Sequence, residues 1–173
     1  MTAARIGFSR SNSKAAVLSI LIRKILGVEF SHVYLGFHSN RANRDLIYQA
    51  NSHGVYFIGE KQFLMHNLIV DEFETEISEE TFNKVLTFCI DESGKSYGFW
   101  NLLGVGIKTM LQKLSISVPN FLSDGNKTYI CSELIAQIYN DLEKADIDPN
   151  TTTPSDLYEI IKKDLDFKRV TNG

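Results

Sequence analysis

The stretch KTYICSELIAQIY, residues 127–139, decides the fold, because it predicts a helix that carries a cysteine in its first turn. Its apolar residues recur at spacings of three and four, as they do along one side of an amphipathic helix: Leu134, Ile135 and Ile138. Its polar residues fall on the other side: Glu133, Gln137 and Asn140. The pattern places Cys131 at the start of this helix.

Cys131 occupies a position that favours nucleophilic chemistry. The unpaired N–H groups at a helix start carry partial positive charge, which stabilises a thiolate and lowers the pKa of the thiol. We expect the sulfur to point out of the helix end, where it can attack a carbonyl group. A cysteine nucleophile also needs a base, which a histidine side chain can supply.

Length and composition predict an ordinary globular protein. The chain has 173 residues, 43% of them hydrophobic and 23% charged, which favours one domain over residues 1–173. A net charge of -3 gives no general attraction to nucleic acid, so no nucleic-acid partner is expected. The chain has 2 cysteines, too few for a disulfide scaffold, and Cys89 is expected to be a small buried residue.

The sequence predicts no signal peptide and no transmembrane segment. The first residues lack a basic region followed by an apolar run and a cleavage site, so a cytoplasmic location is expected. The longest apolar run, residues 15–22, is shorter than the roughly 18 residues that span a bilayer. The helix predicted over residues 14–26 is expected to pack across a sheet, and peripheral contact with a membrane or lipid is the alternative.

Strand patterns early in the chain and helix patterns late in it predict an α+β fold with a mainly antiparallel sheet. The predicted strands are residues 5–9, 28–38, 46–50, 55–58, 68–73 and 167–170. The predicted helices are residues 14–26, a helix capped by Ser78 that ends near Ile90, residues 97–114, the cysteine helix, and a last helix with Pro154 at its first position.

His32 is the histidine best placed to act as the base. In an extended strand, His32, Tyr34, Gly36 and His38 share one face. The other face belongs to the core: Val33, Leu35 and Phe37. The next strand brings a polar residue, Gln49, between apolar neighbours, and its amide oxygen can accept a hydrogen bond from the imidazole.

The other three histidines are less well placed to share a site with Cys131. His38 lies on the order of 20 Å from His32 along the same strand, so both cannot belong to one site. His53 and His66 stand in turn-like segments and are expected to be exposed.

Three segments, taken in their order along the chain, resemble the circularly permuted NlpC/p60 papain-like cysteine hydrolases. They are FSHVYLG at residues 30–36, YICSEL at residues 129–134 and TPSDL at residues 153–157. Residues 5–9 and 97–104 add to the resemblance, which therefore touches most of the chain. The resemblance implies a cysteine helix packed on an antiparallel sheet that supplies a histidine and, from the next strand, a third polar residue.

Carried over residue by residue, the resemblance makes Cys131 the nucleophile, His32 the general base and then acid, and Gln49 the residue that orients His32. The third position is often histidine, asparagine or an acid in this family, so Asn51 is the alternative to Gln49. Unpermuted members carry Asp-Cys-Ser-Gly where this chain carries ICSE, which weakens any inference to cell-wall peptides.

The oxyanion of an acyl-transfer intermediate also needs hydrogen-bond donors. The backbone N–H of Cys131 is one candidate, and the hydroxyls of Tyr129 and Tyr34 are others unless these side chains belong to the core. Ser132 is a further candidate for contact with the substrate. Glu133 is expected to be an acidic residue of the first helical turn. No cofactor or metal is expected.

Three functions follow from this pattern. The first is hydrolysis of amide bonds in a peptide or peptidoglycan fragment through a thioester. The second is a lipid-directed thiol acyltransferase or phospholipase, like the relatives of lecithin retinol acyltransferase, and the apolar residues 15–22 and 99–110 motivate it. The third is a binding module that retains the catalytic pair without turnover.

Overall fold

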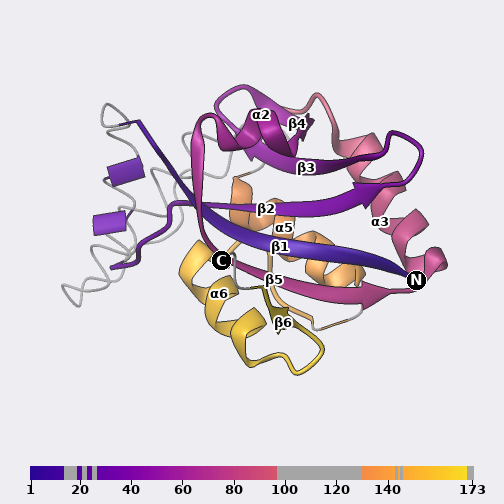
Figure 1. The fold of residues 1–173 in the computed structure, drawn as a ribbon. Helices are drawn as coiled ribbons and strands as arrows, with labels where there is room; N and C mark the ends of the chain where they lie inside the picture. Colours follow the sequence, from indigo (N-terminus) through magenta and orange to yellow (C-terminus); the bar gives the residue numbers. More distant parts are fainter. Residues whose placement is uncertain are drawn as a thin grey trace.

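A six-stranded antiparallel sheet forms the centre of the structure, which is a computed structural model that describes residues 1–13, 19–20, 23–24, 27–96, 130–142, 144 and 146–170. The strands are β1 (Thr2–Ser11), β2 (His32–Ser39), β3 (Arg44–Asn51), β4 (Gly54–Gly59), β5 (Asn67–Ile77) and β6 (Lys168–Arg169). Their spatial order is β4-β3-β2-β1-β5-β6, so β1 and β2 lie at the middle of the sheet (Figure 1). The predicted α+β class is therefore observed.

The described helices are distributed unequally over the two faces of this sheet. They are α2 (Glu60–Leu64), α3 (Glu79–Glu92), α5 (Cys131–Asp141) and α6 (Pro154–Lys163). The last three lie on one face, where they enclose the main apolar core together with Phe8, Val33 and Leu35 (Figure 1). On the other face, α2 places Phe63 in a smaller cluster with Tyr34 and Ile47.

Local sequence signals fix the first residues of two helices. Ser78 caps α3 by accepting a hydrogen bond from the backbone N–H of Thr81 at 3.0 Å. Thr153 caps α6 in the same way, and Pro154 is its first residue, as predicted. The helix predicted over residues 97–114 and the loop that follows it lie outside the described residues, as does most of the helix predicted over residues 14–26.

Helix α2 was not predicted, and it makes the second face of the sheet a buried face. Tyr34 is 0% exposed, and its ring lies against β1 at Gly7. A Cβ atom at Gly7 would stand 2.1 Å from Cζ of Tyr34, so only glycine fits there. Both faces of β2 are therefore packed, whereas the alternating pattern of its sequence indicated one core face.

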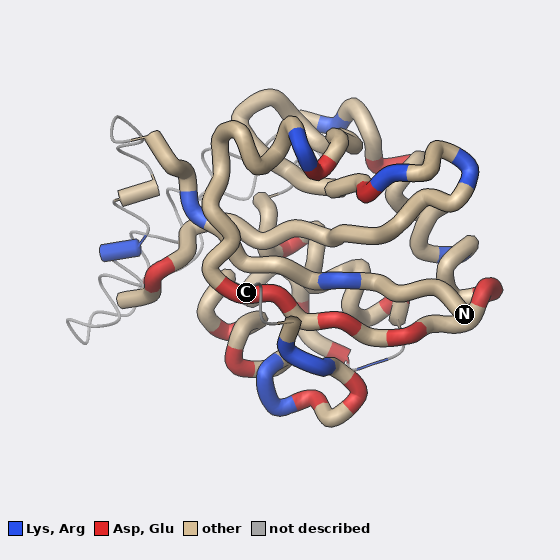
Figure 2. The backbone as a smooth tube through the Cα atoms, in the orientation of Figure 1, with Lys and Arg blue, Asp and Glu red and all other residues tan. Residues whose placement is uncertain are grey.

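Arg5 pairs with two carboxylates on this second face of the sheet. Acidic residues concentrate along β5 (Figure 2): Asp71, Glu72, Glu74 and Glu76. Arg5 of β1 reaches Glu72 at 3.3 Å and Glu60 of α2 at 2.9 Å. The hydroxyl of Tyr34 donates to Glu72 at 2.8 Å, so the buried carboxylate has both a cation and a neutral donor.

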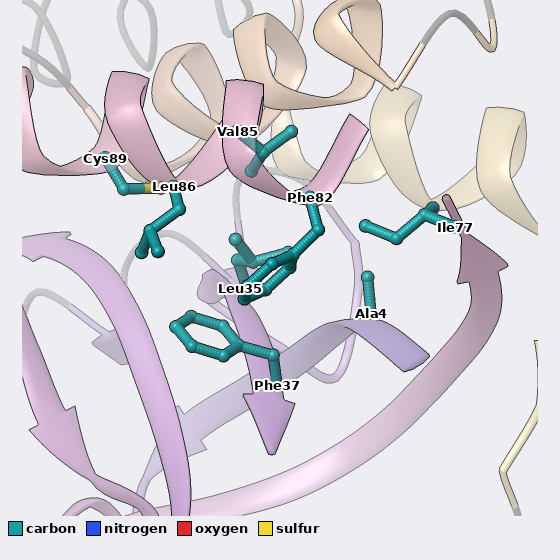
Figure 3. Close-up of a pocket in the computed structure, with 8 residues that line it drawn as sticks. All are labelled: Ala4, Leu35, Phe37, Ile77, Phe82, Val85, Leu86 and Cys89. Atoms are coloured by element: carbon teal, nitrogen blue, oxygen red, sulfur yellow. The ribbon is translucent and has the colours of Figure 1, made fainter. Parts of the chain in front are cut away.

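An apolar hollow lies between α3 and the sheet (Figure 3). Phe82 of α3 and Phe37 of β2 meet edge to face at its centre, with ring centroids 5.4 Å apart. Cys89 lines the hollow and is 0% exposed, which confirms that it is a buried apolar residue. Burial raises the pKa of its thiol above the usual range.

Candidate active site

The sheet opens between β2 and β3 at the end where His32 lies. The hydrogen-bonded register between these strands stops at the pair Leu35 and Tyr48. Strand β2 nevertheless continues to His32, which stays opposite Ser9 of β1. Strand β3 continues to Asn51 and stays paired with β4. Helix α5 packs against both strands, and a backbone hydrogen bond from Val33 of β2 reaches Cys131, so the start of α5 lies next to this end of β2.

A side-chain hydrogen bond crosses the opening. Nε2 of His32 lies 2.8 Å from Oε1 of Gln49, and Gln49 is 2% exposed. The imidazole also lies beside the ring of Phe63, with centroids 6.3 Å apart. The predicted contact between His32 and Gln49 is therefore present. Asn51, the alternative third residue, instead hydrogen-bonds to Tyr56.

The sulfur of Cys131 is enclosed by protein. Cys131 is 2% exposed, and burial raises the pKa of its thiol to about 11. Backbone hydrogen bonding from Val33, Ser132 and Cys131 itself acts in the opposite direction and lowers this pKa, but burial outweighs it. The backbone at the helix start thus lowers the pKa of the Cys131 thiol, as predicted. The expectation that this thiol is accessible and has a low pKa was nevertheless wrong.

His32 is also held in its neutral form. Although the residue keeps some solvent exposure, the protein packed around its ring lowers the pKa of His32 to about 4. The hydrogen bond to Gln49 acts in the opposite direction. At neutral pH the candidate pair is therefore a thiol and a neutral imidazole, and a preformed thiolate and imidazolium are not favoured.

Cys131 and His32 approach the end of β2 from different sides. His32 belongs to the side that carries Phe63, whereas Cys131 belongs to the core beneath α5. Backbone hydrogen bonding from Val33, the residue after His32, connects β2 to the sulfur. Within the part of the chain that the structure describes, no hydrogen bond joins the sulfur to the imidazole.

Two buried hydroxyl groups flank the candidate pair. Ser9 pairs with His32 across the β1–β2 register, and Ser132 follows Cys131 in the first turn of α5. Each residue is 0% exposed, and among the described residues neither Oγ atom has a hydrogen-bond partner. Buried polar atoms are rarely left without partners, and functional sites are one place where they are.

The remaining predicted groups have different surroundings. The proton of the Tyr34 hydroxyl is used by Glu72, which argues against Tyr34 as an oxyanion donor. Tyr129 lies outside the described residues. Glu133 accepts a hydrogen bond from the backbone N–H of Ile130 at 3.0 Å, which is the expected role of an acid at a helix start. His53 and His66 are exposed, as predicted, and the exposed His38 pairs with Asp45.

No family model matches this chain, and no curated protein matches it significantly. Across the described ranges, the structure contains no helix long and apolar enough to cross a membrane. The same ranges contain no group of three or more histidine, cysteine or acidic side chains arranged to hold a metal ion.

The lowered pKa of His32 predicts a loss of stability in mild acid. Between its ordinary pKa of 6.5 and about 4, the unfolded chain binds a proton at His32 that the folded chain does not bind. The contribution of neutral His32 to the stability of the folded chain is thus complete above pH 6.5 and is lost as the pH falls through about 4. It amounts to up to about 3 kcal/mol.

Urea unfolding of the wild-type chain and a His32→Gln variant between these two pH values measures this effect. We expect the wild type to lose more stability than His32→Gln over this range. The exposed His53→Gln variant should behave like the wild type. Equal losses in the wild type and His32→Gln would show that His32 is not held neutral.

Proposed function

We propose that this chain is a cysteine hydrolase that cleaves amide bonds, with a permuted papain-like arrangement of its helix and sheet. The observation that carries the proposal is the hydrogen bond between His32 and Gln49 at the strand end that touches the sulfur of Cys131. A helix that begins at a cysteine and packs on an antiparallel sheet supports the same proposal. The unpartnered hydroxyls of Ser9 and Ser132 beside the pair add to it.

The neutral state of both groups determines the order of proton transfers. Nδ1 of His32 accepts the thiol proton of Cys131 as the sulfur attacks the carbonyl carbon, and Gln49 stabilises the resulting imidazolium through Nε2. The imidazolium then protonates the leaving amine, which leaves a thioester on Cys131. His32 next takes a proton from water, whose oxygen attacks the thioester. The imidazolium then gives this proton to the departing sulfur, which releases the acid and restores the thiol.

Burial of Cys131 favours a second candidate, a binding module that does not turn over. A sulfur that is 2% exposed accepts a substrate only when the atoms that cover it move. The lipid-directed alternative has no comparable support, because residues 99–110 lie outside the described residues and so do most of residues 15–22.

The pH dependence of thiol labelling tests the catalytic pair. Between the two pKa values the pair stays a thiol and a neutral imidazole, so the rate of an attack in which His32 takes the thiol proton does not change with pH. We therefore expect iodoacetamide to label Cys131 of the wild type at a constant rate from about pH 6 to 8. In His32→Ala only the free thiolate reacts, so its rate should rise tenfold per pH unit, about 10²-fold or more below wild type at pH 7.

Mass spectrometry of the labelled peptides includes an internal control. Cys89, which is 0% exposed, should stay unlabelled in both proteins, and Cys89→Ala should label at Cys131 like the wild type. If the wild type and His32→Ala show the same slope against pH, Cys131 and His32 are not a reactive pair.

Substrate class is tested with the same variants. Hydrolysis of acyl-aminocoumarin amides that requires both Cys131 and His32 supports the amide hydrolase. Requirement of the same residues for hydrolysis of phospholipid esters in vesicles, with cosedimentation of the protein, would support the lipid-directed enzyme instead. Labelling without turnover of either substrate class would favour the binding module.

A further inference from the structure

The hydrogen-bond ladder between β2 and β3 ends before the two strands do. Its last pair is Leu35 and Tyr48, and continuation of this register would bring Val33 opposite Ala50. That missing rung would need the backbone N–H of Ala50 to donate to the carbonyl oxygen of Val33. Each of the two residues stays paired with its outer neighbour, β1 or β4, so the ladder is broken only on the side where β2 and β3 face each other.

The backbone N–H of Ala50 points into this missing rung. At the outer edge of β4, the N–H of Val55 donates to the carbonyl oxygen of Lys95 at 3.0 Å, and the carbonyl oxygen of Val55 accepts from the N–H of Gly94 at 2.8 Å. Val55 thus directs both backbone groups away from β3. Ala50 stands opposite Val55, and the two residues of such an antiparallel pair direct their backbone groups away from each other. The N–H of Ala50 therefore faces β2.

The sulfur of Cys131 lies at the same missing rung. The backbone N–H of Val33, which a continued ladder would direct to β3, instead reaches this sulfur. Val33, Ala50 and Cys131 belong to one core cluster, and α5 packs against both strands. Ala50 is 0% exposed, so bulk water does not replace the partner that its N–H lacks in the described part of the sheet.

An N–H in this state has a catalytic use. A buried backbone donor without a partner is costly, and few are left in folded proteins. If the donor is paired only when negative charge develops on a reacting oxygen, its hydrogen bond stabilises the transition state and not the resting state. The N–H of Ala50 meets this condition, because it faces the strand end where the sulfur lies.

We propose that the backbone N–H of Ala50 is an oxyanion donor, which acts with the backbone N–H of Cys131 on the carbonyl oxygen of the substrate. This inference rests on the proposed function. As the sulfur bonds to the carbonyl carbon, the π electron pair of the C=O bond moves to the oxygen, where the two N–H groups stabilise it. The pair returns when the C–N bond breaks, and the departing nitrogen takes its proton from His32. The movement that admits substrate to Cys131 also opens the missing rung.

Proton–nitrogen NMR of the full chain tests this donor before and after addition to the sulfur. In the resting protein we expect the amide proton of Ala50 to lie upfield, as for an N–H without a hydrogen bond. The amide proton of Ala4 should lie downfield, because Ala4 is a buried alanine that pairs with Thr75 inside the β1–β5 ladder. N-acetylglycinal adds to a thiol as a hemithioacetal, in which sulfur bonds to the aldehyde carbon and the thiol proton moves to the oxygen. The adduct at Cys131 should move the Ala50 proton downfield and leave that of Ala4 unchanged.

An amide-to-ester change measures the kinetic effect of the donor. In vitro translation with L-lactic acid in place of Ala50 removes the N–H and keeps the methyl group. Hydrolysis of acyl-aminocoumarin amides should slow about 10²–10³-fold, mainly in kcat, as for the loss of one oxyanion donor. Labelling of Cys131 with iodoacetamide should keep the wild-type rate, because displacement of iodide forms no oxyanion. The same ester in place of Ala4 breaks a ladder hydrogen bond, so it should lower stability more than the ester at Ala50 and affect kcat less.

The inference is overturned if the Ala50 proton does not move in the hemithioacetal, or if the chain with the ester in place of Ala50 hydrolyses amides at the wild-type rate. A downfield, hydrogen-bonded Ala50 proton in the resting protein would also overturn it, and this measurement needs no variant. Failure of the proposed function looks different. N-acetylglycinal and iodoacetamide would then leave Cys131 of the wild type unmodified, while the resting Ala50 proton would still lie upfield.

Discussion

Replacement of Arg5 by alanine is expected to lower the free energy of unfolding by about 3–5 kcal/mol, because it removes the cation beside a buried carboxylate. Glu72 has a side chain that is 1% exposed, and Arg5 contacts it at 3.3 Å. Arg5 also holds Glu60 at the start of α2, which covers this face of the sheet. Without Arg5, Glu72 keeps only the neutral donor of Tyr34.

Urea unfolding of Arg5→Ala and two other variants isolates this effect. Arg10→Ala breaks an ion pair with Glu29 at 2.8 Å whose members are both exposed, and it should cost about 1 kcal/mol or less. Adding Glu72→Gln to Arg5→Ala removes the buried charge and should recover part of the loss. Equal losses for Arg5→Ala and Arg10→Ala would show that burial of Glu72 does not control the stability of this cluster.

Replacement of Phe8 by alanine is the second large change, with an expected loss of about 3–5 kcal/mol. Phe8 is 0% exposed at the middle of the sheet. Its ring centroid lies 4.9 Å from that of Phe30 and 5.1 Å from that of Tyr158 in α6. The substitution therefore opens a cavity between β1 and α6 and removes edge-to-face contacts that α6 makes with the sheet.

Denaturant unfolding again measures this loss, which should appear as a lower midpoint with an unchanged slope. Leu165→Ala is the control, because Leu165 is 97% exposed and its truncation should change stability by less than about 0.5 kcal/mol. Phe8→Leu keeps most of the buried volume and should lose less than Phe8→Ala. A midpoint for Phe8→Ala equal to that of the control would place Phe8 outside the stabilising core.

The structure changes the chemistry that the sequence suggested for the candidate pair. The position of Cys131 at a helix start predicted a thiolate, but the residue is buried, and burial raises the pKa of its thiol to about 11. The pKa of His32 falls to about 4 for the same reason. If the chain is a hydrolase, proton transfer therefore accompanies attack on the carbonyl, and the rate should change little between these two values.

The periodicity of the sequence was sufficient to predict the elements that carry the candidate site. The alternation around Val33 and Leu35 predicted β2, and the three- and four-residue spacing of Leu134, Ile135 and Ile138 predicted α5. The contact between His32 and Gln49 could be predicted because the two strands are neighbours in the chain. Their catalytic roles, with that of Cys131, stay predictions.

Helix α2 and Tyr56 could not be found in this way. A helix of 5 residues is too short to show a period, although Phe63 within it buries the second face of the sheet. Tyr56 has an ordinary strand environment in the sequence, and only the register of β3 and β4 places its hydroxyl on Gln49 and Asn51.

The sequence by itself determined the strands, the cysteine helix and the neighbours of His32, because hydrophobic periodicity and capping depend on residues close together in the chain. Tertiary structure alone decided the protonation states of Cys131 and His32, the opening between β2 and β3, and the contact of Gln49 with Tyr56. These properties depend on burial and on hydrogen-bond partners that folding brings together from distant parts of the chain.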